Sequence, residues 1–248
     1  MISVPEEIDL TNFTFIIPAV AVGNIGQLCA DLLITTLNMQ KVEGGIWNER
    51  FIPLVGQDPY NLESTTICNA LDLYVSVENK LLVLQTRSLH VSPLRQFCEE
   101  IAEFMEKRKI GKIVILSSSY RHESNPELVS HMKYIASPDI LETNREFFMK
   151  LNWIEHSATP LGAMPTERIS GGGFANLLTD IFLNKNLAFI VLFQHYFEGD
   201  NLADSVEFTK QINSWLNLLK SNENGGQCIK CPPSWNHFFG NSPPEGIF

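Results

Sequence analysis

FTFIIPAVAVGNIGQLCADLLITTLN, residues 13–38, is the stretch that decides the fold of this 248-residue chain. Its first five residues are β-branched or aromatic, which is typical of a buried strand, and Pro18 ends the run because proline cannot donate to a central ladder. After a turn at Gly23, apolar residues recur at helical spacing, which predicts an amphipathic helix: Ile25, Leu28, Cys29, Leu32, Leu33 and Leu37. Strand, loop and helix form the first half of an α/β unit.

The loop before this helix is a candidate anion site, because helix N–H groups point out of such loops. Asn24 is predicted to be the N-cap, and Gln27 sits where a capping-box side chain reaches back to the backbone. The glycines read Gly23-Asn-Ile-Gly26 instead of G-x-G-x-x-G, and no P-loop lysine follows. We therefore favour a closely packed strand-to-helix turn over a phosphate cradle.

Further strands and helices follow along the chain. We predict a three-layer α/β/α sandwich with a mixed central sheet, in which residues 1–221 form one α/β domain and residues 222–248 a C-terminal extension that packs on it or reaches out with an apolar tip. The expected elements are a strand at 42–47, an ordered loop at 50–60, a hairpin of 70–77 with 81–84, a helix at 92–110, a buried strand at 113–116, a helix at 143–150, a strand at 153–154, a helix at 174–183, a strand at 188–193 and a last helix starting at Asp200 or Asn201. The inner face of that last helix is predicted to carry Leu202, Val206, Thr209, Ile212, Leu216 and Leu219.

Composition excludes several classes of partner. The net charge is −10 and no long basic run occurs, so we expect neither nucleic acid nor an anionic membrane to bind. The N-terminal residues lack the basic and apolar regions of a signal peptide, and no apolar segment approaches the length of a membrane span. Five dispersed cysteines fit a soluble intracellular protein with reduced thiols, and Cys29 and Cys98 are expected in the core.

Three places carry candidate chemistry. Ser117 to Ser119 follow a buried strand, at the edge where open α/β sheets bind ligands. Ser119 is a candidate nucleophile with His122 as its base. Against this, the sequence has no G-x-S-x-G elbow, and serines at the end of a strand more often cap a turn. Residues 171–173 are three glycines that either form an anion nest or let two backbones approach, and we favour the second. Cys228 and Cys231 form a C-x-x-C with no second pair for zinc, which we interpret as incidental.

Two segments are candidates for protein contacts. The loop at 50–60 contains Phe51, Leu54 and Tyr60, which either form a contact surface or tuck onto the core. The tail from residue 232 carries two proline pairs and ends in Ile247 and Phe248, which suits a spacer with an apolar tip; the alternative is a disordered terminus.

Several short sequence segments, taken in their order along the chain, resemble the proteasome assembly chaperone family. The matching strings run collinearly from the first strand to the last residue: 22–27 (VGNIGQ) into 31–39, 53–56 (PLVG) with Pro59 and Tyr60, 113–119, 151–153 (LNW), 171–173, 198–201 (EGDN), 233–235 (PSW) and the terminal Pro243-Pro244 to Phe248. No single string is diagnostic, but a collinear set over the whole chain is specific.

This resemblance implies a non-enzymatic role without a cofactor. It implies a heterodimer with proteasome assembly chaperone 1 that binds proteasome α-subunits on the outer face of the α-ring, promotes ring assembly and prevents off-pathway α-ring dimers, in the cytoplasm and nucleus. It also implies a fold similar to nucleoside phosphorylases. Related chaperones end in a hydrophobic–tyrosine–any-residue tail, whereas this chain ends in Ile247-Phe248, so docking of these two residues on the α-ring is a hypothesis that departs from the family pattern.

Two other functions remain open from the residues alone. One is a nucleoside-type hydrolase or phosphorylase that uses the loop near Ser119 and needs converging polar groups in a pocket. The other is redox or zinc chemistry at Cys228 and Cys231.

Overall fold

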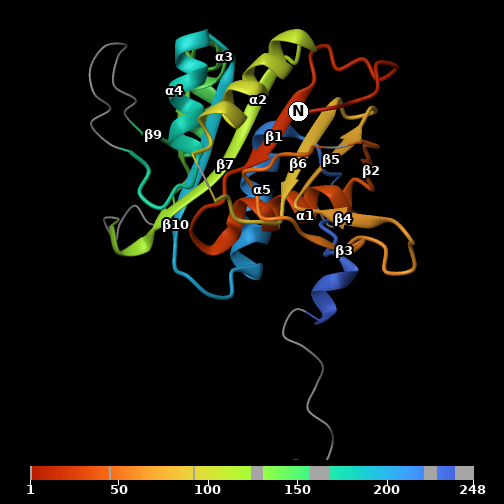
Figure 1. Cartoon of the computed structure of the whole chain (residues 1–248). Coiled ribbons are helices and arrows are strands. Elements are labelled where there is room, and N and C mark those ends of the chain that lie inside the picture. The colour runs from red at the N-terminus through yellow and green to blue at the C-terminus, as the bar shows by residue number, and fades with distance from the viewer. Residues whose placement is uncertain are drawn as a thin grey trace, which may run out of the picture.

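The computed structural model describes residues 2–44, 46–91, 93–123, 131–156, 168–220 and 228–237. Its centre is an eight-stranded sheet in the order β2-β5-β6-β1-β7-β10-β8-β9 (Figure 1). These strands are β1 (Thr14–Pro18), β2 (Gln40–Lys41), β5 (Leu71–Ser76), β6 (Leu81–Thr86), β7 (Lys112–Tyr120), β8 (Lys133–Ala136), β9 (Ile154–Glu155) and β10 (Phe189–Tyr196). A separate two-stranded hairpin joins β3 (Val55–Gln57) to β4 (Ile67–Asn69).

The sheet is mixed, as predicted. β6, β1, β7 and β10 run parallel to one another, whereas β5 is antiparallel to β6 and β8 is antiparallel to β10. β1 and β7 lie in the middle of this order, which explains why their sequences are continuous apolar runs instead of alternating ones.

Helices cover both faces of the sheet. One core packs under α1 (Ile25–Thr36), α3 (Pro138–Lys150) and α5 (Leu202–Leu216), and includes Cys29, Phe148 and Phe208. The other packs under α2 (Arg95–Lys107) and α4 (Ala175–Lys185), and includes Phe97 and Phe182. The predicted three-layer α/β/α arrangement is therefore confirmed. None of the described helices has the length and hydrophobicity needed to cross a bilayer.

The opening strand, turn and helix form as predicted, but the helix cap does not. Asn24 has left-handed dihedral angles (φ 54°, ψ 24°) and makes no capping bond, and the Gln27 amide donates to the Asn24 side chain at 3.4 Å instead of bonding its backbone. The turn is closely packed, because a Cβ on Gly26 would lie 2.7 Å from the Leu116 carbonyl oxygen. The favoured packing role of this turn is thus supported.

The glycines at 171–173 also serve a close approach of two backbones. Gly173 has φ +59°, and a Cβ there would lie 2.2 Å from the carbonyl oxygen of Val20. Gly171 accepts a backbone bond from Val22 through its carbonyl. This segment therefore packs against the loop that follows β1, which supports the favoured interpretation.

Several predicted elements were wrong in extent. The strand expected at 42–47 is instead β2 at Gln40–Lys41, and the loop expected at 50–60 contains β3. β8 was not predicted. α3 begins at Pro138 instead of Thr143, because Ser137-Pro138 is a helix start that the prediction from apolar spacing overlooked. α2 is shorter than 92–110, and β9 begins one residue later than expected.

The last helix, α5, starts where it was predicted, but the residues that face the core differ in part from those predicted. The Asp200 carboxylate accepts the N–H of Leu202 at 3.1 Å, whereas the Asn201 amide donates to backbone carbonyls, including that of Gly23. Leu202, Val206 and Leu216 are only half-buried, and the buried positions on α5 are Ser205, Phe208, Thr209, Ile212 and Asn213. Phe208 takes the central place because it is the largest apolar side chain on the helix face toward the core.

Candidate functional site

A patch of exposed apolar side chains lies beside the β3–β4 hairpin. Among the described residues, twelve large apolar side chains are exposed, and eight of them come from three neighbouring segments, which concentrates exposed hydrophobicity in one region. We call this region the apolar surface; its members are Trp47, Ile52, Leu54, Val55, Leu62, Ile67, Leu89 and Val91. Contiguous exposed apolar patches mark sites of protein contact more often than isolated residues do.

Phe51 anchors the loop that presents half of this surface. Its side chain is 2% exposed and packs edge-on against Phe97 of α2, with ring centroids 5.0 Å apart. The backbone on either side pairs with the segment after β6: the N–H of Ile52 donates to Leu89 at 3.0 Å, and the N–H of Val91 donates to Arg50 at 2.8 Å. The loop is therefore fixed from below, and its apolar neighbours remain on the outside.

The hairpin presents the other part of the surface by strand alternation. Val55 lies opposite Asn69 and Gln57 opposite Ile67, so Val55 and Ile67 share one face of the hairpin. That face is outward, because Val55 is 69% and Ile67 54% exposed, while Cys68 on the other face is buried. Apolar side chains on the outer face of a short hairpin gain nothing from this chain's own core.

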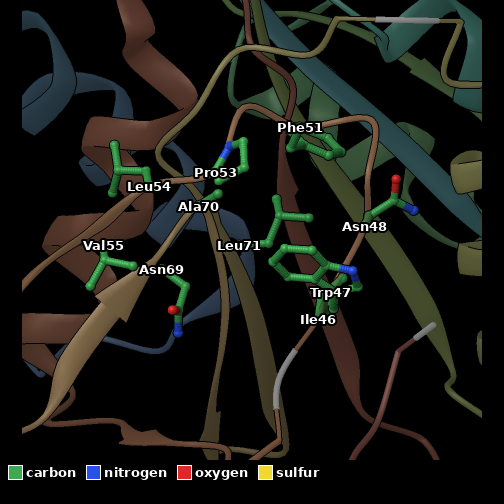
Figure 2. A pocket seen from close by; sticks show the side chains of 10 residues that line it. All are labelled: Ile46, Trp47, Asn48, Phe51, Pro53, Leu54, Val55, Asn69, Ala70 and Leu71. Carbon is green, nitrogen blue, oxygen red and sulfur yellow. The ribbon is translucent and has the colours of Figure 1, made fainter.

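A small cavity of about 70 Å³ opens within the apolar surface. Figure 2 shows the Trp47 ring on one side of it and Leu54 and Val55 on the other, with Leu71 between them. The volume is far below the roughly 300–1,000 Å³ of a small-molecule site, so it suits one inserted side chain rather than a metabolite. A more open groove of about 580 Å³ adjoins it and shares Ile46, Asn69 and Leu71.

Buried charges hold the hairpin to the sheet. Asp72 on β5 is 1% exposed and forms ion pairs with Arg87 at 2.8 Å and Lys41 at 2.7 Å. Its carboxylate also accepts the backbone N–H of Asn69 at 2.9 Å, and Lys41 donates to the carbonyl of Ile67 at 2.6 Å. Because Asn69 and Ile67 belong to β4, these bonds fix the base of the hairpin.

The same network continues to Tyr60 and α1. The Arg87 guanidinium donates to the hydroxyls of Tyr60 at 3.1 Å and Tyr74 at 3.2 Å. The Tyr60 hydroxyl in turn donates to the Asp31 carboxylate at 2.6 Å, and the amide of Gln85 donates to the same carboxylate. Removal of Asp31 from water raises the pKa of its carboxyl group, and burial beside Asp31 raises the pKa of Tyr60 well above its usual value.

Residues 228–237 lie against the domain next to this network. The N–H of Lys230 donates to the Thr36 hydroxyl at 2.9 Å, and the N–H of Ser234 donates to the carbonyl of Pro59 at 3.3 Å. The Trp235 side chain hydrogen-bonds the Asp31 carboxylate. In Figure 1 the short helix of residues 233–237 lies below β3.

The three predicted contact residues have different positions. Leu54 is 38% exposed within the apolar surface, Phe51 is buried, and Tyr60 is half-buried in the polar network. In the structure Phe51 and Tyr60 support the loop from within. Whether any of the three residues touches a partner stays a prediction. Ile247 and Phe248 lie outside the described residues.

The three serines that follow the apolar run of β7 were expected in a loop, but they lie in the strand itself. Ser117, Ser118 and Ser119 belong to β7 and pair with Phe193, Gln194 and His195 of β10. All three are buried; the Ser117 hydroxyl donates to the carbonyl of Gly172 at 3.0 Å and that of Ser118 to Val22 at 2.5 Å.

His122, by contrast, is exposed in the 3₁₀ turn after β7 (Arg121–Glu123). The open-loop position on which the catalytic hypothesis rested is thus wrong. The hydroxyls of Ser117 and Ser118 instead tie the glycine segment and the first loop to the sheet.

The cysteines divide into two groups. Cys29, Cys68 and Cys98 are buried, as predicted for Cys29 and Cys98, and burial raises the pKa of the Cys29 and Cys98 thiols to about 12. Cys228 and Cys231 are exposed and free. Within the part of the chain that the structure describes, no group of three or more His, Cys, Asp or Glu side chains is placed to hold a metal ion.

Sequence reasoning missed most of the apolar surface. Trp47, Val55 and Ile67 lie in three-residue strands and turns that carry no periodic signal, and only the tertiary structure brings them together. Asp31, Asp72 and Arg87 were also missed, because isolated charges on amphipathic elements resemble solvated ones until their partners are known.

The comparisons with known proteins agree with one another. The model of the PAC2 family matches residues 15–218. Proteins named proteasome assembly chaperone 2 are 34% identical in Mus musculus and 32% in Homo sapiens, each over 97% of this chain and 96% of the relative.

Among solved structures, Pyrococcus furiosus PbaA, described as an archaeal homolog of proteasome-assembly chaperone, superposes with a TM-score of 0.66 at 17% identity over 89% of this chain and 87% of that one. P. furiosus PbaB, described as an archaeal proteasome activator, gives 0.61 at 16% identity over 89% and 90%. At these identities the two structures show a shared fold, which is the α/β architecture described above.

Proposed function

This chain belongs to the PAC2 family, and from that premise we propose that it is a proteasome assembly chaperone that forms a heterodimer with proteasome assembly chaperone 1. The observation that carries the proposal is the similarity to proteins named proteasome assembly chaperone 2 over nearly the whole of both chains. The dimer would bind α-subunits, promote their assembly into the α-ring and prevent off-pathway ring dimers.

The mechanism we propose is surface complementarity without chemistry. The apolar surface offers contact area and a cavity of side-chain size, and the serines once considered for catalysis are buried in β7. A chaperone of this kind needs no cofactor, because its effect comes from holding subunits in an arrangement that they reach slowly alone. The protein would act in the cytoplasm and nucleus.

We assign the apolar surface to the partner chaperone rather than to the α-ring. Permanent interfaces resemble a domain core cut in half and are more apolar than interfaces that form and dissociate. The centre of the surface, with Trp47 beside Val55, has the aromatic and aliphatic composition of such an interface, since tryptophan is enriched among the residues that dominate binding energy.

We assign α-ring contact to a separate part of the chain that includes Ile247 and Phe248. Phe248 supplies an aromatic ring there, although Ile247-Phe248 departs from the hydrophobic–tyrosine–any-residue pattern of related chaperones. Deletion of these two residues tests this assignment. If the truncated protein binds α-subunits as tightly as the full chain, these residues have no part in the mechanism.

The partner surface is tested by introducing a charge into it. Val55→Asp places a carboxylate on an exposed position that needs no refolding, and Met149→Asp on α3 is a control of equal exposure, 68% against 69%. Each variant is co-expressed with proteasome assembly chaperone 1, and the complex is quantified by affinity capture and native mass spectrometry.

We expect Val55→Asp to weaken the heterodimer at least tenfold and Met149→Asp to leave it unchanged, because an unpaired charge at the centre of an apolar interface loses its water without gaining a partner. Equal heterodimer yields from both variants would refute the assignment of this surface. Failure of the wild-type chain to capture the partner or to accelerate α-ring formation on native gels would refute the proposed function itself.

A further inference from the structure

The C-terminal segment, residues 228–237, is held on the domain by hydrogen bonds to α1, to the hairpin loop and to the polar network. Residues 228–237 contain no strand, and their only regular structure is the 3₁₀ helix at Pro233–His237. Even so, they contact the body at several places, among them the end of α1, the loop before Tyr60 and the buried network. A segment near a chain terminus loses its order unless specific contacts tie it down.

Asp31 is the group on which these contacts converge. Its carboxylate accepts hydrogen bonds from Tyr60, Gln85 and Trp235, that is, from the hairpin loop, the sheet and the C-terminal segment. The Arg87 guanidinium adds a positive charge to the same network through the Tyr60 hydroxyl. Hydrogen bonds to a charged acceptor in a partly dry site are stronger than those between neutral groups.

Two further bonds hold the segment on either side of Trp235. The Thr36 hydroxyl at the end of α1 accepts the N–H of Lys230, and the carbonyl of Pro59 accepts the N–H of Ser234. The side chain of Pro232 is buried between them, and Ile229 packs against the core under α1 and α5. The attachment is therefore built from several contacts, and the one to Asp31 involves a charged side chain.

We propose that Asp31 is a positioning residue for the tail: by holding Trp235 it clamps residues 228–237 on the domain and fixes the point, beside the β3–β4 hairpin, from which residues 238–248 leave. This inference rests on the proposed function for its consequence, because the clamp matters to α-subunits only if Ile247 and Phe248 contact them. The clamp itself is a property of this chain and is measurable without any partner.

The clamp gives the chain that follows it a defined starting point. With residues 228–237 held on the domain, the chain continues toward Ile247 and Phe248 from one place beside the β3–β4 hairpin, and loss of the contacts at Trp235 removes that fixed place. A binding segment that is held in place in advance pays less ordering entropy when it binds.

Hydrogen–deuterium exchange of the full-length protein tests the clamp. The variants are Trp235→Ala, which acts from the segment, and Asp31→Asn, which acts from α1. Trp47→Ala is the control, since it removes a tryptophan that is 73% exposed and lies outside the segment. We expect amides of residues 228–237 to exchange at least tenfold faster in the first two variants and at the wild-type rate in the control. Exchange in β1 and β7 should stay unchanged in all three.

Wild-type exchange at residues 228–237 in Trp235→Ala would overturn the clamp, as would fast exchange there in the wild-type protein. If Asp31→Asn loosens the whole domain, Trp235→Ala decides alone, because its side chain belongs to the segment. Affinity for purified α-subunits is measured in parallel, and a loss of affinity is expected for Trp235→Ala. If deletion of residues 247–248 leaves that affinity intact, the tail assignment fails while the exchange result still decides the clamp.

Discussion

The five cysteines of this protein differ in how accessible their thiols are to reagents. Burial raises the pKa of Cys29 and of Cys98 to about 12, so the nucleophilic thiolate form is scarce at pH 8, and both side chains are buried. Cys228 and Cys231 are exposed. We expect maleimide to modify these two in the folded protein, and all five cysteines in denaturant, as counted by intact mass spectrometry. Labelling of Cys29 without unfolding would contradict the described core.

Asp72 is a residue whose loss should strongly destabilise the protein. Asp72→Ala leaves the Arg87 guanidinium, with 15% exposure, without its buried counter-ion, and breaking such a pair by removing one partner costs about 3–5 kcal/mol. Asp180→Ala is the matched control, because its pair with Arg168 is largely exposed and should be worth less than about 1 kcal/mol. Urea unfolding followed by circular dichroism measures both free energies. Equal losses would show that the network under the hairpin contributes no more than a surface pair.

At the scale of elements, the fold depends on places where two backbones meet. Gly173 combines a left-handed φ of +59° with a position where a Cβ would lie 2.2 Å from the carbonyl oxygen of Val20. Gly44 also has a positive φ, +83°, but the atom nearest to such a Cβ would be the Ser3 hydroxyl oxygen at 3.8 Å, an ordinary contact distance. The pair separates the cost of backbone strain from the cost of a steric clash.

We therefore expect Gly173→Ala to destabilise the protein well beyond Gly44→Ala. Strain at a positive φ accounts for about 1–2 kcal/mol in each, and the clash with Val20 adds to it only at Gly173. The free energy of unfolding from urea titration gives both values. If the two variants lose the same stability, the loop after β1 moves freely away from the glycine segment, and the close packing has no energetic weight.

The elements that sequence predicts here are those with long, uniform signals. β1, α1 and β10 follow from apolar runs or helical spacing, and the β5–β6 hairpin from two strands joined by a polar turn. β3, β4 and β8 have three or four residues each, too few for a period to emerge. The cap at Asn24 failed for a different reason: the tight turn at Gly23 forces left-handed angles on the residue whose side chain would have capped the helix.

The candidate site was harder to predict than the fold, because its residues come from separate segments that meet only in the tertiary structure. The loop at 50–60 drew attention through its apolar residues, yet the structure turns Phe51 inward and adds Trp47, Ile67 and Val91 from outside that loop. The polar network joins residues from α1, the sheet and residues 228–237, whose proximity no local pattern records. Strand topology decides which segments meet at one edge, and in this chain it brings the hairpin and the C-terminal segment together.

For the whole molecule, the concentration of exposed apolar side chains on one side predicts self-association when the partner is missing. Six of the eight members of the apolar surface are at least 46% exposed, and an uncovered area of this kind favours contact with a second copy. The net charge of −10 opposes association but is spread over the chain, and salt screens it beyond about 8–10 Å. We therefore expect the isolated protein to associate reversibly, and more strongly at higher salt.

A charge on the hairpin should abolish this association. Ile67→Asp introduces a carboxylate at the centre of the apolar surface, and Val77→Asp, at a comparably exposed position at the other end of β5, introduces the same charge elsewhere. Sedimentation velocity over a concentration series at two salt concentrations should give a monomer for Ile67→Asp and wild-type association for Val77→Asp. If the wild-type protein stays monomeric throughout, the apolar surface does not drive self-association. The heterodimer interface would then have to be sought on another face.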